Sequence, residues 1–147
     1  MGNMTYSEQG LALTKHFEGL RLAAYQDQRG IWTIGYGHTG RDVHEGLTVT
    51  EAEAEALLAS DIARATAAVN RLVTAPVTQN QFDALVDLAF NLGCAALMHS
   101  TLLALVNSSD FAAAASEFLR WDHAGGRVVP GLLLRRQAEL ELFNRSA

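Results

Sequence analysis

The chain has few of the residues that would force a particular architecture. Its 147 residues include only one cysteine and two prolines. The single cysteine, Cys94, excludes an intramolecular disulfide framework, so the fold does not depend on an oxidising compartment. Because Cys94 lies in an apolar run, we expect a small buried hydrophobic side chain rather than a nucleophile. Scarce proline together with abundant alanine and leucine favours a mostly helical protein.

Long apolar stretches are also missing. The longest run, residues 94–106, is interrupted by polar side chains, and it is shorter than the roughly 20 residues that span a bilayer. The N-terminus has neither a basic region nor an apolar core of the kind found in secretory signals. We therefore expect no transmembrane segment in this chain, with a removed N-terminal leader or anchor as the alternative.

The chain as a whole lacks an excess of positive charge. The net charge is −5, and residues 42–55 contain five acids without a lysine or an arginine. The absence of a basic stripe argues against nucleic-acid binding. A solvated helix face is the simpler interpretation of the acidic segment, and a binding role is the alternative. The five histidines show no metal-ligand spacing, and we expect neither a metal nor a cofactor.

Glycine spacing and helix signals divide the chain into a β part and a helical part. Six of the twelve glycines fall in residues 19–46, where short strands are predicted at 21–25 and 31–36. A first helix, capped near residues 5–8, is predicted to end at Glu18. Capping boxes predict helix starts after residues 50 and 78, the first of these helices continuing to about residue 72. Later helices are predicted at about 100–107, 110–119 and 132–143, with an extended loop between residues 125 and 131.

Two carboxylates and a hydroxyl, those of Glu18, Asp27 and Thr33, lie within one short segment. Glycoside hydrolysis requires two carboxyl groups in different surroundings, one protonated and one ionised. In the last turn of a helix, Glu18 would face the negative end of the helix dipole, which favours its protonated form. Taken singly, the three residues are more typical of a solvated helix end, a turn and a strand than of a catalytic site.

The segment resembles the catalytic signature of the phage-type lysozymes, glycoside hydrolase family 24. Glu18 is followed after eight residues by Asp27 and after five more by Thr33, and then by the sequence Ile-Gly-Tyr-Gly-His-Thr at 34–39. Blocks between residues 79 and 139 are similar to the family as well, so the resemblance covers about residues 7–143. One departure is Leu134, where many members have the first of three consecutive arginines.

This resemblance implies a single lysozyme-like catalytic domain over residues 1–147, mainly α with an α+β character. A small β-containing lobe is expected at about 20–47, and a long linking helix at about 50–72. A helical lobe is expected at about 76–147, joined by the N-terminal helix. The resemblance places the cleft between the two lobes.

The resemblance also implies an endolysin, a muramidase that causes host cell lysis. Such an enzyme hydrolyses the β-1,4 bond between N-acetylmuramic acid and N-acetylglucosamine in bacterial peptidoglycan, with inversion. Glu18 would be the general acid, while Asp27 and Thr33, facing the cleft together, would position and activate water. The two carboxyl groups would then lie roughly 6.5–9.5 Å apart. The alternatives are a lytic transglycosylase acting on the same bond and a catalytically silent cell-wall-binding domain.

Further roles follow from the same resemblance. Gly35, Tyr36 and His38 are candidate substrate-binding residues. For His38, we favour a structural role, in which it holds the turn, over a hydrogen bond to the substrate. Arg135 and Arg136 either pair with an acid on the catalytic helix or are solvated. The enzyme would remain in the host cytoplasm until release and then act in the periplasm or cell wall. A holin or another membrane permeabiliser is the expected partner for release.

Overall fold

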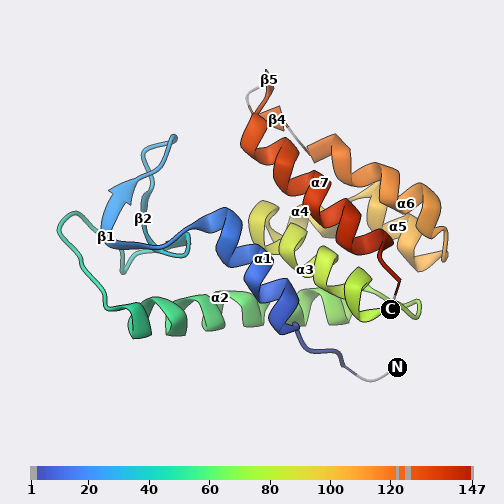
Figure 1. The fold of residues 1–147 in the computed structure, drawn as a ribbon, viewed down its shortest axis with the longest axis horizontal. Helices are drawn as coiled ribbons and strands as arrows, with labels where there is room; N and C mark the ends of the chain where they lie inside the picture. Colours follow the sequence, from blue (N-terminus) through green and yellow to red (C-terminus); the bar gives the residue numbers. More distant parts are fainter. Residues whose placement is uncertain (1–2, 122, 125–126, 147) are drawn as a thin grey trace. The chain divides into compact units, whose positions relative to one another are not determined.

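The structure is a computed structural model that describes residues 3–121, 123–124 and 127–146. The chain divides into two compact units (Figure 1). The first, called here the β unit, consists of residues 11–64. The second, called the helical unit, consists of residues 1–10 and 65–147. Helices α1 (Glu8–Glu18) and α2 (Glu51–Leu72) each contribute residues to both units.

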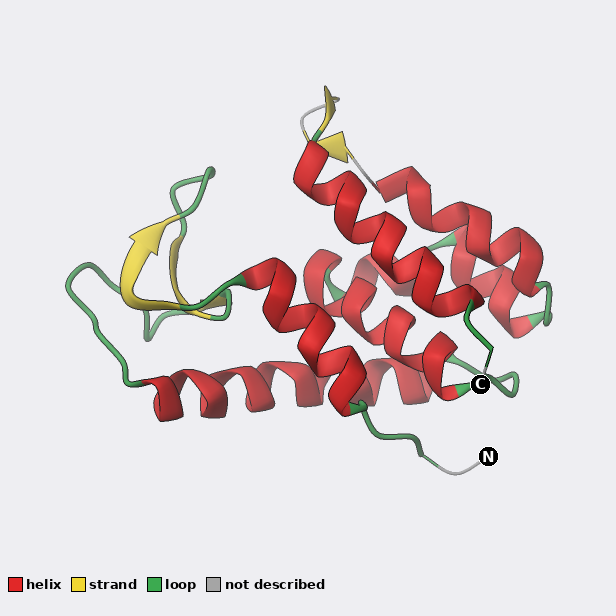
Figure 2. Ribbon diagram, in the orientation of Figure 1, coloured by secondary structure: helices red, strands yellow, loops and turns green. Residues whose placement is uncertain are grey.

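The β unit contains a three-stranded antiparallel sheet in the order β1-β2-β3. Figure 2 draws strands in yellow. Its strands are β1 (Arg21–Gln26), β2 (Trp32–Gly35) and β3 (His38–Thr39). The first two strands confirm the sequence prediction to within one residue at each end. The two-residue β3 was not predicted, because two residues are too few for an alternating pattern to be recognised.

Side-chain caps fix the starts of the first three helices. Ser7 precedes α1, and its Oγ accepts a hydrogen bond from the Gly10 N–H at 3.1 Å. Before α2, Thr50 and Glu53 exchange backbone–side-chain hydrogen bonds of 3.0 and 3.1 Å, which form the predicted capping box. Thr78 caps α3 (Gln79–Leu92) by the same arrangement. The predicted starts of α2 and α3 are therefore confirmed, and Ser7 is the cap of α1.

The helical unit has its core around α3, whose residues 82–89 are all buried. The helices α4 (Cys94–Met98), α5 (Thr101–Asn107) and α6 (Phe111–Glu117) follow, then the 3-10 helix η1 (Phe118–Trp121). A short hairpin, β4 (His123–Ala124) and β5 (Arg127–Val128), precedes α7 (Pro130–Asn144). In the described part of the chain, no helix is both long and apolar enough for a membrane crossing.

Three sequence predictions for the helical unit were wrong. Helix α4 was missed because it is only five residues long and has no side-chain cap. The segment expected to be an extended loop, residues 125–131, includes the strand β5, which pairs with β4. Its last two residues begin α7, because the fixed φ of Pro130 suits a first helical position. Cys94 is half-buried rather than fully buried.

Candidate active site

Glu18 is the last residue of α1, as predicted, and its side chain is half-buried. The helix ends there because Gly19 has a left-handed backbone (φ 69°) and its N–H donates to the Lys15 carbonyl at 2.9 Å. The carboxyl group of Glu18 lies directly against Gly37, where a Cβ atom would overlap Glu18 Oε1. The end of α1 and the turn between β2 and β3 therefore meet at this carboxyl group.

Asp27 opens the turn between β1 and β2. Its Oδ1 accepts hydrogen bonds from the backbone N–H groups of Arg29, at 2.8 Å, and Ile31, at 2.9 Å. The bond from Ile31, reinforced by that from Arg29, lowers the pKa of Asp27 below its ordinary value. Within the described part of the chain, Oδ2 accepts no hydrogen bond. Asp27 is therefore held as an ionised carboxylate with one oxygen open to an incoming donor.

Thr33 lies in β2 and is only 4% exposed. Its Oγ1 donates a hydrogen bond of 3.0 Å to the carbonyl oxygen of Ile31. Asp27 and Thr33 are therefore both hydrogen-bonded to the backbone of Ile31: Asp27 accepts from its N–H, and Thr33 donates to its carbonyl oxygen. Because the hydroxyl proton is donated to the carbonyl, the lone pairs of Oγ1 point away from that bond and can accept a hydrogen bond from water.

Gly35 and Tyr36, two of the candidate substrate-binding residues, both make contacts inside the β unit. A Cβ at Gly35 would lie 3.4 Å from the Ala54 Cβ of α2. Tyr36 is 8% exposed, and its hydroxyl lies 3.3 Å from Glu55 Oε1. Burial, reinforced by the Glu55 charge, raises the pKa of Tyr36. These contacts favour structural roles for both residues, and sugar contact stays a prediction for them.

His38 is buried between two carboxylates. Its Nδ1 lies 2.8 Å from Asp61 Oδ2 and its Nε2 lies 3.0 Å from Asp42 Oδ2. Burial alone would lower the pKa of His38, but the hydrogen bonds to Asp61 and Asp42 outweigh it and raise the pKa. Arg64 also contacts Asp61, at 2.9 Å. The expected structural role of His38 agrees with this geometry.

Two residues near Glu18 were not identified from the sequence. Lys15 Nζ lies 2.7 Å from Glu55 Oε1 and 5.4 Å from the centroid of the Tyr36 ring. The hydrogen bond between the two charged groups raises the pKa of Lys15 and lowers that of Glu55. Lys15 is three residues before Glu18 on α1, a spacing that could have been noticed. Glu55 is 40 residues away from Lys15, and no local pattern connects them.

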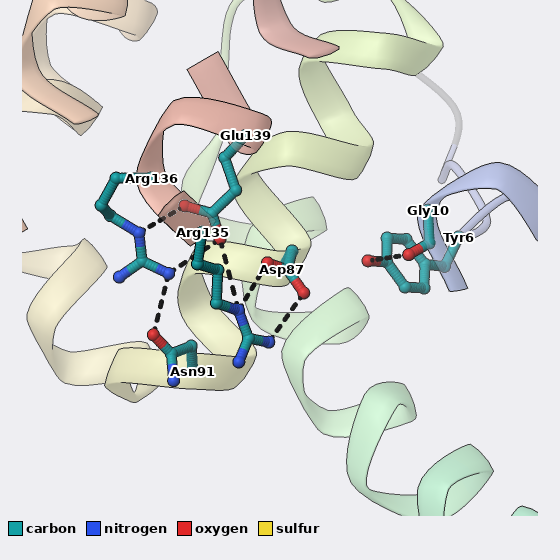
Figure 3. A network of polar contacts seen from close by, with 7 residues as sticks. All are labelled: Tyr6, Gly10, Asp87, Asn91, Arg135, Arg136 and Glu139. Atoms are coloured by element: carbon teal, nitrogen blue, oxygen red, sulfur yellow. Dashed lines mark hydrogen bonds and ion pairs between the residues drawn. The ribbon is translucent and has the colours of Figure 1, made fainter. Parts of the chain in front are cut away.

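The two arginines of α7 form a buried network in the helical unit (Figure 3). Arg135 binds both oxygens of Asp87 on α3, at 2.9 and 3.0 Å. Arg136 forms an ion pair with Glu139 Oε1 at 2.6 Å, and it donates hydrogen bonds to Glu139 Oε2 at 2.9 Å and to Asn91 Oδ1 at 2.8 Å. Burial and the nearby Asp87 raise the pKa of Glu139. Of the two alternatives, solvated arginines are wrong, because both side chains are buried beside acids of α3 and α7. Pairing with an acid of the catalytic helix stays a prediction.

Comparison with known proteins agrees with the motif and with the fold. The family model described as phage lysozyme matches residues 15–139. The endolysin of Acyrthosiphon pisum secondary endosymbiont phage 1 is 49% identical over 144 residues, covering 95% of this chain and 98% of that protein.

Solved structures give the same result. An endolysin from Escherichia coli O157:H7 phage FAHEc1 has a TM-score of 0.91 and 37% identity, covering 99% of this chain and 97% of that one. The muramidase domain of SpmX from Asticaccaulis excentricus has a TM-score of 0.89 and 42% identity, covering 97% and 99%. The predicted fold class, mainly α with a small antiparallel sheet, is confirmed. The chain belongs to the phage lysozyme family.

Proposed function

We propose that the chain is an endolysin muramidase that hydrolyses the β-1,4 bond between N-acetylmuramic acid and N-acetylglucosamine, with inversion. As a phage lysozyme it is a glycoside hydrolase that degrades peptidoglycan for host lysis. One observation carries the finer proposal: the two carboxylates have different surroundings. Glu18 is half-buried at the carbonyl end of α1 against Gly37, whereas Asp27 is held ionised by backbone N–H groups.

In the proposed mechanism, Glu18 donates its proton to the glycosidic oxygen as the bond to the anomeric carbon breaks. A water molecule on the opposite face donates one hydrogen bond to Asp27 Oδ2 and the other to Thr33 Oγ1. Its oxygen attacks the anomeric carbon, and its proton passes to Asp27. Inversion requires the carboxyl groups of Glu18 and Asp27 to be roughly 6.5–9.5 Å apart, so that the water fits between sugar and base.

Replacing Glu18 with glutamine tests the proposal most directly. The amide has nearly the same shape but cannot supply the proton, and general acid catalysis is worth roughly 100- to 10,000-fold. We expect Glu18→Gln to lose activity by that factor while its circular dichroism and Tm stay near wild type. Glu141→Gln, an exposed change on α7, is the matched control. A well-folded Glu18→Gln protein with wild-type activity would sink the assignment.

The products distinguish the proposal from its alternatives. Mass spectrometry of digested wall should find reducing ends, whereas a transglycosylase gives anhydro ends and a silent binding domain gives no products. NMR at early times should show the α-anomer formed from a β-linked chain. An initial β-anomer would indicate a covalent intermediate and a nucleophilic role for Asp27.

We also propose that the enzyme reaches the wall from the host cytoplasm with the help of a holin or another permeabiliser. The reason is topological: the protein is synthesised in the cytoplasm, and peptidoglycan lies on the other side of the cytoplasmic membrane. Expression of the chain in intact cells should cause no lysis until the membrane is permeabilised, for example with chloroform. Lysis without any permeabiliser would contradict this part of the proposal.

A further inference from the structure

The turn between β2 and β3 makes two different contacts with α1. Gly37 lies at the tip of the turn. Because it has no Cβ, it leaves room for the Glu18 carboxyl group, which a Cβ at this position would overlap. Tyr36, the residue before it, presents its ring to Lys15, one helical turn before Glu18. Residues three apart on a helix lie on the same face. The same face of α1 is therefore in contact with two consecutive residues of the turn.

A third element completes the arrangement. Glu55 of α2 binds the Lys15 ammonium at 2.7 Å and lies 3.3 Å from the Tyr36 hydroxyl. Lys15 therefore contacts a carboxylate and the face of an aromatic ring at the same time. The two contacts together restrain the cation more than either contact alone. Lys15, Tyr36 and Glu55 are called here the clamp. The clamp joins α1, the turn and α2 within the β unit.

We propose that the clamp and Gly37 position the carboxyl group of Glu18 for proton donation. The proposal rests on the role of Glu18 as general acid. Gly37 provides the space in which the carboxyl group sits, and the clamp fixes the turn against α1 so that this space does not shift. None of the four residues reacts, and all are positioning residues.

The exposure of the clamp supports a positioning role over a stabilising one. The Lys15 and Glu55 side chains are 30% and 41% exposed, and exposed ion pairs contribute little to the free energy of unfolding. Catalysis is more sensitive, because a misplacement of about 1 Å can reduce the rate roughly 100-fold. Loss of the clamp should therefore reduce turnover far more than stability.

Gly37→Ala, compared with Gly46→Ala, separates the space for Glu18 from backbone strain. Both glycines have a left-handed φ, 78° and 87°, so alanine strains the backbone similarly at either position. A Cβ at Gly46 would meet nothing within 4 Å, whereas one at Gly37 would meet the Glu18 carboxyl group. On a soluble glycan fragment of the wall, we expect kcat to fall roughly 100-fold in Gly37→Ala, with KM within about threefold. Gly46→Ala should keep the wild-type kcat, and equal losses in the two variants would overturn the proposal.

The clamp is tested with Lys15→Met, which removes the ammonium and keeps the apolar stem. We expect kcat to fall about tenfold, with little change in KM or Tm. This loss is smaller than that expected for Gly37→Ala, in which the new Cβ displaces the Glu18 carboxyl group directly. Lys15→Arg, which keeps the charge and the contact with the ring, should restore most of kcat. Glu141→Gln removes an exposed carboxylate of another ion pair and should leave kcat unchanged. An unaltered kcat in Lys15→Met, or no rescue by arginine, would overturn the clamp.

The outcomes also separate this inference from the proposed function. If Glu18→Gln retains activity, the role of Glu18 fails, and the positioning role fails with it. If Glu18→Gln is inactive while Gly37→Ala and Lys15→Met turn over at the wild-type rate, only the positioning role fails. Tyr36→Phe provides a further check that preserves packing: it removes only the hydroxyl that meets Glu55, and its kcat should fall less than that of Lys15→Met.

Discussion

The two units use their charged side chains in different ways. In the helical unit, Arg135 is 4% exposed, and Arg136, Asp87 and Glu139 are completely buried. In the β unit, Lys15, Glu55 and Asp42 are partly solvated, with side chains 30%, 41% and 61% exposed, and even the His38–Asp61 pair keeps 11% and 13% of its side-chain surface exposed. A buried charge without its partner is costly, whereas an exposed charge is compensated by water. The buried network should therefore determine folding, and the partly exposed pairs should determine geometry and pH response.

The largest effect on stability is expected at the buried network. Asp87→Asn removes the carboxylate that binds Arg135 at 2.9 and 3.0 Å and leaves the more distant Glu139, at 3.9 Å. Breaking a buried pair in this way costs about 3–5 kcal/mol. Denaturant unfolding monitored by circular dichroism would measure the loss. Glu141→Gln breaks an exposed pair with Arg145 on the same helix and should change the free energy of unfolding by less than about 0.5 kcal/mol. Similar losses in both variants would mean that burial does not distinguish the two kinds of pair.

A smaller effect, dependent on pH, is expected at His38. Since its pKa is raised in the folded protein, the pairing stabilises fully below the unfolded pKa, about 6.5, and is lost as pH rises through the folded value. The hydrogen bond with His38 lowers the pKa of Asp42. The contribution of Asp42 to the free energy of unfolding is therefore present above its unfolded pKa, and it is lost as the pH falls through its folded pKa.

The variant Asp61→Asn tests this linkage. Near pH 5.5 it should be less stable than wild type by about 1.5–3 kcal/mol, the range for a hydrogen bond to a charged group. Most of the difference should vanish by about pH 9, where the imidazole is neutral. Unfolding curves at several pH values would show the change, and a difference that is constant with pH would rule out protonated His38 as its source.

The fold was largely predictable because its main signals are local. Thr50 with Glu53, and Thr78 with Gln81, cap their helices through contacts three residues apart. Helix α4 could not be predicted in this way, since it follows Gly93 without any side-chain cap. The ends of the helices α1 and α3 were likewise visible in the sequence, since each is followed by a glycine with a positive φ.

The candidate site was only partly predictable. Glu18, Asp27 and Thr33 lie in one segment with a recognisable spacing, but their surroundings depend on contacts between distant residues. The Glu55 partner of Lys15 and the Asp61 partner of His38 lie on α2, 40 and 23 residues away. The sequence suggested that the glycines at 35 and 37 admit a sugar chain. Sugar contact stays a prediction, but the sequence did not show that these two positions also lie against Ala54 and Glu18.

Thr33 gives a third test, in which stability and activity should separate. Thr33→Val keeps the β-branched shape but removes the hydrogen bond to the Ile31 carbonyl, a loss of about 1 kcal/mol. If the hydroxyl also holds the attacking water, kcat should fall by at least about tenfold, as expected for a misplaced reactant. Thr48→Val, at an exposed position of the same unit, is the control. A stability loss with unchanged turnover would limit Thr33 to a structural role.

The smallest effect is expected from the exposed acids of the β unit. Asp42, Glu45, Glu51 and Glu53 are all exposed and belong to the same unit as Glu18 and Asp27. Peptidoglycan with its attached polymers is generally anionic, so encounter is slowed by repulsion that extends roughly 30 Å at 0.01 M salt and about 10 Å at 0.1 M. Activity on isolated wall should therefore rise a few-fold between these salt concentrations. The double variant Glu45→Gln with Glu51→Gln should flatten the rise, whereas Glu141→Gln in the helical unit should leave it unchanged. Activity that falls steadily from the lowest salt would instead show that the arginines of the helical unit attract the wall more strongly than these acids repel it.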